Sequence, residues 1–309
     1  MKKGVSVILT AWNTQDYIEE CLDSVYKQSF FKKNDNYEVL LGIDGCEKTL
    51  NKVKEIISKY PGLKVFYFKE NAGTYIVSNT LATFAQYSYL FRFDTDDIML
   101  PDAIKDIYAY AEDKKFDMVL GRCKNLYSTT GKVDKRSALA PGQMLVKTET
   151  FLMFGGFRPF KCGADSEFFM RLKKFVNEDM SKIEIGLRRL HSNNLTGRSE
   201  TGMKSKYRKD IRAFLKYELE TKLKSKTNAV IKCITAPCYE MNENGEVSKS
   251  KVESNFIPAE IADMFEEFMN LPDNVRRQYY KKNNTGMPIM MTSTGYIRKK
   301  AQSGWIGYM

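Results

Sequence analysis

The feature that most constrains the fold of this chain is an alternation of short apolar runs and helical segments in its N-terminal part. The runs have the length of buried strands and lie at residues 5–9, 38–43, 64–68 and 89–93. Segments with helical periodicity follow them near residues 18–25, 49–59 and 75–85 and from Pro101 onward. Strands joined by helices of this length form crossovers between parallel neighbours. The pattern therefore predicts an α/β fold with a mostly parallel sheet flanked by helices.

Three acidic residues cluster where the fourth of these runs ends. Asp94, Asp96 and Asp97 directly follow residues 89–93. Like charges this close repel each other, so a bound cation explains the cluster, and carboxylates favour a hard ion such as Mg²⁺ or Mn²⁺. The alternative is that these acids only cap the helix that opens near Pro101.

Polar residues also follow the ends of the other predicted strands. Asn13, Asp44 and Asn71 each lie just past such an end. Ligands of parallel sheets bind at the carboxyl ends of the strands, so we expect these side chains to line one cleft with Asp94.

The bulk composition narrows the class of protein. The 309 residues are 43% apolar, which suits a folded chain of one large α/β domain with an extension. No apolar stretch approaches the roughly 18 residues that span a bilayer, so we expect no transmembrane segment. Six cysteines without a Cys-x-x-Cys pair, and a single histidine, make a zinc site implausible and indicate free thiols in the cytoplasm. The net charge of +11 favours a polyanionic partner, although a generally lysine-rich composition would give the same value.

The composition shifts after Gly197, which predicts a division into residues 1–197 and 198–309. A long basic helix is expected over residues 204–226, with an apolar row from Tyr207 to Leu223. After this helix we expect a short strand region near residues 229–239 and two helices that begin at Pro258 and Pro272. We expect this extension to be largely helical, and to bind an acceptor or form a homo-oligomer.

Several short motifs follow one another in order over residues 4–195. The first three are a strand with an aromatic-Asn turn (5–13), Asp-Gly (44–45), and Asn-x-Gly with a later Asn (71–79). The next three are Asp-x-Asp-Asp with a later Pro (94–101), Gly-Gly-Phe with a later Asp-x-Glu (155–167), and Arg-x-His (189–191). In this order they resemble family 2 glycosyltransferases of the GT-A fold. The sequence departs from the family at Thr10, Ile43, Ser78 and Ala164, where proline, aspartate, a basic residue and glutamate are usual.

The resemblance implies inverting transfer of a sugar from a nucleoside diphosphate sugar, commonly UDP-linked, to an acceptor hydroxyl. It implies Asp165 as the general base, Asp96 as a ligand of Mg²⁺ or Mn²⁺, and His191 as a contact of the metal or diphosphate. The residues implied to bind the donor are Ala11, Trp12, Asn13, Asp44, Asn71, Asn79, Asp94 and His191.

Each of these roles has a simpler alternative. Asp165 could be a helix N-cap, His191 an ordinary histidine, Asp44 part of a turn, and Trp12 a packing residue.

The acceptor is left open by the sequence. A glycan or polysaccharide precursor is the family default, and a hydroxylated nucleobase in DNA is the alternative. In the second case the phosphates would be bound by basic residues of the extension, namely Arg198, Lys204, Arg208, Lys209 and Arg212. A non-catalytic nucleic-acid-binding protein would explain the basic extension but not the ordered carboxylates.

Overall fold

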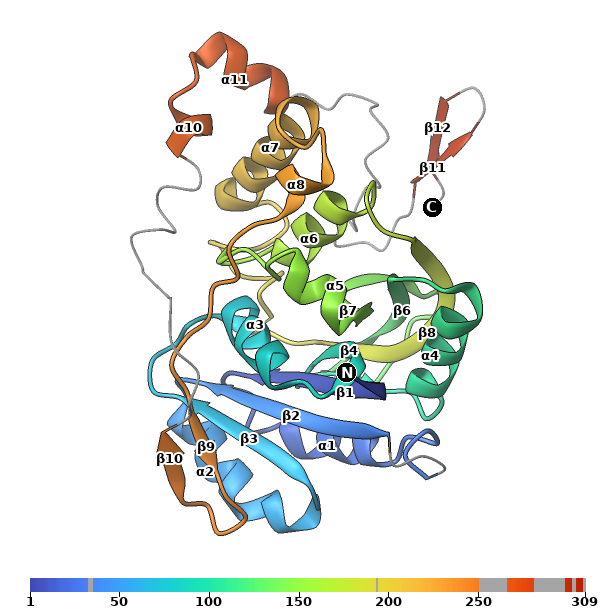
Figure 1. Ribbon diagram of the computed structural model, residues 1–309, viewed down its shortest axis with the longest axis vertical. Helices are drawn as coiled ribbons and strands as arrows, with labels where there is room; N and C mark the ends of the chain where they lie inside the picture. The colour runs from blue at the N-terminus through green and yellow to red at the C-terminus, as the bar shows by residue number, and fades with distance from the viewer. Residues whose placement is uncertain (33–35, 193, 250–265, 281–297, 302–303, 308–309) are drawn as a thin grey trace.

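The structure is a computed structural model built around one mixed sheet (Figure 1). The residues it describes are 1–32, 36–192, 194–249, 266–280, 298–301 and 304–307. The main sheet has ten strands in the order β10-β9-β3-β2-β1-β4-β7-β6-β8-β5.

The N-terminal half of the sheet is parallel, as predicted. It contains β1 (Lys2–Ala11), β2 (Tyr37–Asp44), β3 (Leu63–Phe68) and β4 (Tyr87–Asp94). These strands pair in parallel, with β1 between β2 and β4 and with β3 outside β2. Their carboxyl ends therefore lie at one edge.

The rest of the sheet is mixed. It contains β5 (Ile98–Met99), β6 (Met118–Tyr127), β7 (Ala138–Lys147) and β8 (Glu178–Leu190). Strand β7 runs antiparallel to both β4 and β6, whereas β6 and β8 are parallel. The predicted α/β fold class is confirmed. Strands β1 to β4 form its all-parallel part, and the acidic cluster follows β4.

Helices cover both faces of the sheet (Figure 1). One core contains residues of α1 (Ile18–Tyr26), α2 (Glu47–Ile56) with the 3₁₀ turn η1 (Ile57–Lys59), and α4 (Ala103–Lys114). The other contains residues of α3 (Thr74–Phe84), α5 (Thr148–Met153) and α6 (Ala164–Leu172). In β1, Val7 and Leu9 face the first core and Ile8 the second, which is the period of two expected for a strand buried on both sides.

The predicted basic helix is α7 (Lys206–Thr221), and it packs on the core of the preceding residues. Its apolar row turns inward, so that Ile211 and Leu215 are buried with residues of α6. This burial explains why the helix forms here, because an amphipathic helix gains most of its stability from its packed face.

The segment after α8 (Lys226–Ala229) runs back along the molecule past α3 to the far edge of the sheet (Figure 1). There β9 (Tyr239–Met241) pairs with β3, and β10 (Val247–Lys249) pairs with β9. The strand expected over residues 229–239 was wrong except for its last residue. Ile234 and Ala236 bond instead to Asn79 and Thr80 of α3, which leaves no regular ladder there.

The remaining described elements are α10 (Glu266–Met269), α11 (Asp273–Tyr280), β11 (Arg298–Ala301) and β12 (Gly304–Gly307). The helix predicted after Pro272 is α11, and the one predicted at Pro258 lies outside the described residues. Within the described ranges, no helix is long and apolar enough to cross a membrane. The division of roles between residues 1–197 and 198–309 stays a prediction.

A buried ion network joins α7 to the rest of the fold. Arg171 of α6 is 1% exposed, and its Nε lies 2.6 Å from Glu167 Oε1. Its guanidinium also donates to three backbone carbonyls, including that of Ala229 at 2.9 Å. Arg158 extends the network from Glu167, at 3.2 Å, to Glu218 of α7, at 3.1 Å.

Arg171→Met is expected to lower the free energy of unfolding by about 3 kcal/mol or more, because it leaves a buried carboxylate underpaired and three carbonyls without their donor. Denaturant unfolding measures this. Lys174→Met, at an exposed position of the same region, is the control and should change stability by less than about 0.5 kcal/mol. Equal stabilities of the two variants would contradict a structural role for the network.

Candidate active site

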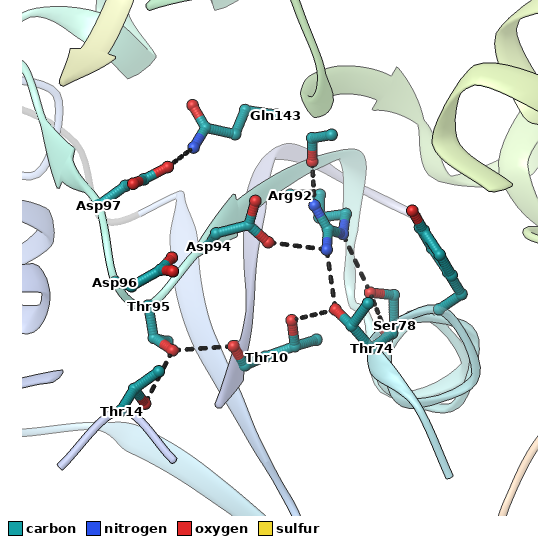
Figure 2. A network of polar contacts seen from close by, with 12 residues as sticks. Thr10, Thr14, Thr74, Ser78, Arg92, Asp94, Thr95, Asp96, Asp97 and Gln143 are labelled. Atoms are coloured by element: carbon teal, nitrogen blue, oxygen red, sulfur yellow. Dashed lines mark hydrogen bonds and ion pairs between the residues drawn. The ribbon is translucent and has the colours of Figure 1, made fainter. Parts of the chain in front are cut away.

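The ends of β1 and β4 bring the acidic cluster to the sheet edge. Thr10 of β1 lies opposite Asp94 of β4, and the buried Thr95 bonds to the Thr10 carbonyl at 2.9 Å and to Thr14 Oγ1 at 3.1 Å. These bonds hold the loop after β4 against the loop after β1 (Figure 2). The arrangement presents Asp94 and Asp96 beside the turn that contains Asn13.

Asp96 and His191, which are distant in sequence, meet at this edge. His191 Nε2 lies 3.1 Å from Asp96 Oδ2, and Asn194 Nδ2 donates to the same oxygen at 3.3 Å. The ring of Tyr17 lies 4.8 Å from the imidazole, centre to centre. The Arg189 guanidinium donates from Nε to the Asp96 carbonyl at 3.0 Å and lies over Tyr17. The structure thus brings together the predicted metal ligand Asp96 and the predicted metal or diphosphate contact His191, and these two roles stay predictions.

Asp97 points away from this pair into the protein. Its Oδ1 accepts from the backbone N–H of Arg189 at 2.7 Å, and its Oδ2 accepts from the amide of Gln143. Burial, and then the neighbouring carboxylates of Asp96 and Asp94, raise the pKa of Asp97 well above its usual range. Asp97 therefore fixes the loop and the end of β8 rather than facing a ligand.

The Asp96–His191 geometry fits a divalent cation. Two ligand atoms on adjacent corners of an octahedron with bonds of about 2.1 Å lie about 3 Å apart. Asp96 Oδ2 and His191 Nε2 have this spacing, at 3.1 Å. No group of three or more Asp, Glu, His or Cys side chains suited to a metal occurs within the described part of the chain. A cation bound here would take its other ligands from substrate and water, as Mg²⁺ commonly does.

Asp94 is held by a buried arginine of its own strand (Figure 2). Arg92 Nη2 lies 2.8 Å from Asp94 Oδ1, and Arg92 is 5% exposed. Burial raises the pKa of Asp94, and Asp96 and Asp165 raise it further, against the opposing effect of Arg92. This ion pair fixes the orientation of the carboxylate predicted to contact the donor.

Asp165 lies across Gly142 from Asp94. A Cβ atom built on Gly142 would be 3.1 Å from Asp165 Oδ2 and 3.6 Å from Asp94 Oδ2. Asp165 sits in the first turn of α6, where Gly163 and not Asp165 is the N-cap, and Asp165 Oδ1 accepts from the N–H of Ser166. The N-cap alternative is therefore wrong, and the carboxylate lies beside the acidic cluster.

The turn after β1 carries an exposed aromatic side chain. Trp12 is 42% exposed, and the Arg198 guanidinium lies 4.9 Å from its ring centre. Asn13 adopts a left-handed backbone conformation with φ of 56°, which asparagine tolerates better than most residues. The structure thus places Arg198, predicted to bind the acceptor, against Trp12, which was predicted to bind the donor. Ala11, the last residue of β1, is buried.

Asp44 holds the loop after β3. Its two carboxylate oxygens accept from the N–H groups of Ala72, at 2.7 Å, and Gly73, at 3.0 Å. Asn71 donates to the Asp44 carbonyl at 3.3 Å. Burial raises the pKa of Asp44 to about 6, although the two backbone bonds act in the opposite direction. Its contact with a nucleotide base stays a prediction.

Asn79 does not reach the site, which corrects its predicted role in donor binding. It is fully buried, and its amide donates to the carbonyls of Phe157, at 2.8 Å, and Ile234, at 3.1 Å. Its Oδ1 accepts from the Phe157 N–H at 2.8 Å. Asn79 therefore joins α3 to the Gly-Gly-Phe loop and to the segment after α8.

Four of the basic residues predicted to bind the acceptor lie in α7 or just before it, and they differ in exposure. Lys204, Lys209 and Arg212 are exposed, whereas Arg208 is partly buried and donates through Nε to the Thr201 carbonyl at 3.0 Å. Arg208 Nη1 lies 3.9 Å from the position of a Cβ on Gly163, two residues before Asp165. Although Arg212 is exposed, partial desolvation by surrounding protein atoms, and then the neighbouring Arg208, lower its pKa. Two like charges are therefore held together near Asp165.

Sequence comparison decides the family of this chain. The model of the family described as glycosyl transferase family 2 matches residues 6–178, which is more than half of the chain. The chain belongs to glycosyl transferase family 2. The resemblance inferred from the ordered motifs is thereby confirmed.

Two curated relatives of this family 2 member act on poly(ribitol-phosphate) by name. The poly(ribitol-phosphate) beta-N-acetylglucosaminyltransferase TarP of Staphylococcus aureus is 31% identical over 42% of this chain and 38% of its own length. A poly(ribitol-phosphate) beta-glucosyltransferase of Bacillus spizizenii is 26% identical over 40% of this chain and 19% of its own. The chain therefore spans less than half the length of these relatives.

The fold is also that of solved glycosyltransferases. Residues 1–349 of S. aureus TarS, in complex with UDP-GlcNAc, superpose with a TM-score of 0.56 at 16% identity, covering 90% of this chain and 78% of that one. The Pyrobaculum calidifontis mannosyltransferase PcManGT, solved with GDP-Man and Mn²⁺, gives a TM-score of 0.50 at 18% identity over 69% and 62% of the two chains. These similarities confirm the predicted fold.

Three residues of the family 2 site were missed by the sequence reasoning. Arg92, Gly142 and Arg189 each bind or border one of its aspartates. The position of Arg92 inside the apolar run 89–93 was visible in the sequence and indicated a buried partner, because an unpaired buried charge is costly. Gly142 carried no indication, because only the folded chain places it between two carboxylates.

Proposed function

We propose that this chain is an inverting glycosyltransferase that moves a sugar from a UDP-sugar to an acceptor hydroxyl. The observation that carries the proposal is the convergence of Asp94, the Asp96–His191 pair and Asp165 at one sheet edge. Asp96 and His191 would hold a Mg²⁺ or Mn²⁺ ion. When bound, such an ion offsets the negative charge that develops on the departing diphosphate.

The residues of the chain divide the remaining tasks. The Asp165 carboxylate accepts the proton of the acceptor hydroxyl as its oxygen bonds to the anomeric carbon and the bond to the diphosphate oxygen breaks. Asp94, held by Arg92, orients the donor at its ribose. A single displacement of this kind, with the base on the face opposite the leaving group, inverts the anomeric configuration.

A donor panel tests this proposal. UDP-, GDP- and dTDP-sugars are incubated with the protein, Mn²⁺ and either water or glycan acceptors, and nucleotide release is measured. We expect release from UDP-sugars and a product of inverted configuration by NMR. Retention of configuration, or release only from another nucleotide, would contradict the corresponding part of the proposal.

We further propose an acceptor that carries phosphate groups. Among the described residues, neither Arg208 nor Arg212 forms an ion pair with a carboxylate, and both lie on the Asp165 side of the molecule. Paired guanidinium groups without a counter-ion suit a phosphate ligand. The names of TarP and the Bacillus enzyme support a polyol-phosphate polymer, and no relative named here supports the nucleobase alternative.

Replacing Arg208 and Arg212 together by glutamine is expected to raise the KM for a phosphate-bearing acceptor at least about tenfold, since one charge-assisted hydrogen bond contributes about 1.5 kcal/mol or more. Donor hydrolysis should not change. The control is Lys209→Gln, which removes one charge from an exposed position of the same helix. An unchanged KM for the double variant, or salt-sensitive DNA binding that the double variant loses, would contradict the phosphate-polymer acceptor.

A further inference from the structure

Arg92 is a charged side chain in the interior of the sheet, and its contacts come from three separate elements. It lies in β4, between apolar neighbours, and is 5% exposed. Taking a guanidinium out of water is costly unless its donors are bonded. The structure meets this need with polar groups from α3, β4 and β7, and the rings of Tyr75 and Phe157 lie near its guanidinium carbon at 5.9 and 6.0 Å.

The guanidinium uses its nitrogens in different directions (Figure 2). Nη2 lies 2.8 Å from both Asp94 Oδ1 and Thr74 Oγ1, and Nε donates to Ser78 Oγ at 3.3 Å. Nη1 donates to the carbonyl of Gly142. One side chain therefore fixes both the donor-side carboxylate and the backbone of β7 beside it.

The Gly142 contact places Arg92 between the two halves of the proposed reaction. Around this glycine, a Cβ would meet Asp165 Oδ2 at 3.1 Å, Arg92 Nη1 at 3.3 Å and Asp94 Oδ2 at 3.6 Å. Two carboxylates approach the same point and would repel each other without a cation between them. The fixed charge of Arg92 offsets this repulsion, because arginine stays protonated at any ordinary pH.

Given the proposed function, we infer that Arg92 is a positioning residue that holds Asp94 and Asp165 in their working arrangement across Gly142, and that position 78 of α3 can supply the same cation. Ser78 is 1% exposed, and its hydroxyl is the α3 contact of the Arg92 Nε. A longer side chain at position 78 enters the volume that the guanidinium occupies. The same cationic centre is thus reachable from the helix as well as from the strand.

The test moves the guanidinium from one element to the other. Arg92→Met is expected to lower kcat/KM for transfer about 10²-fold, the cost typical of reacting groups misplaced by about 1 Å. Adding Ser78→Arg to this variant should recover at least about tenfold of the loss. Arg92→Lys, which can pair with Asp94 but cannot fork to Thr74 and Gly142 as well, should fall between.

Two further readouts separate positioning from general stability. Thermal unfolding of each variant shows whether activity follows folding, and Ser78→Arg alone should lower the unfolding midpoint because two cations then compete for one volume. If Arg92→Met does not fold, Arg92→Lys and the double variant Arg92→Met/Ser78→Arg, which both keep a cation, test the inference in its place.

Wild-type kinetics in a folded Arg92→Met would overturn the inference. A double variant that regains stability but not turnover would also overturn it. The same holds for a Ser78→Arg variant that is as stable as the wild type. Donor hydrolysis by the wild type is measured in parallel, so that failure of these variants is distinguished from failure of the proposed function.

Discussion

Asp96→Asn is expected to abolish sugar transfer while leaving the fold intact. A neutral amide binds a divalent cation more weakly than a carboxylate does, and His191 alone would remain to hold the ion. Side-chain burial at Asp96 is only partial, so the unfolding midpoint should stay close to that of the wild type. Nucleotide release and Mn²⁺ affinity are measured side by side for the two proteins.

The matched control for Asp96→Asn is Asp113→Asn. Asp113 is an exposed residue of α4, outside the site, and its replacement makes the same chemical change. The control should keep full activity. Wild-type turnover in the Asp96→Asn variant would show that Asp96 is not a ligand of a required metal.

Asp165→Asn is expected to reduce transfer at least about 10²-fold, the usual contribution of a positioned general base. The affinity for UDP should change little, because the base acts on the acceptor. Acceptor turnover under saturating donor, together with UDP binding by calorimetry, measures both effects. A variant that loses donor affinity but keeps its turnover at saturation would place Asp165 on the donor side instead.

The local patterns of the sequence were enough for the parallel part of the fold. Continuous apolar runs mark β1 to β4, because these strands are buried on both faces, and a period of 3.6 marks the helices between them, because each buries one face. Strand-end rules then placed Asp94 and Asp96 at the correct edge. The prediction that Asp96 and His191 both belong to the site came from the resemblance and not from any local pattern.

What the sequence could not show depends on contacts between distant segments. Asn79 was assigned to the donor site by motif position, yet its amide is used by Phe157 and Ile234, which lie far along the chain. The segment before β9 was expected to be a strand, but it bonds to a helix instead. The role of Arg92 depends on its proximity to Gly142 and Asp165, which only the folded chain brings close to it.

If Asp96 and His191 hold the cation that a UDP-sugar needs in order to react, UDP release must depend on that cation. The most direct measurement is UDP release from UDP-sugars by the wild-type protein in Mn²⁺, after chelation, and after Mn²⁺ is restored. We expect release that saturates with donor, is lost in excess chelator and returns with the metal. Release that continues unchanged in excess chelator would contradict this role of Asp96 and His191.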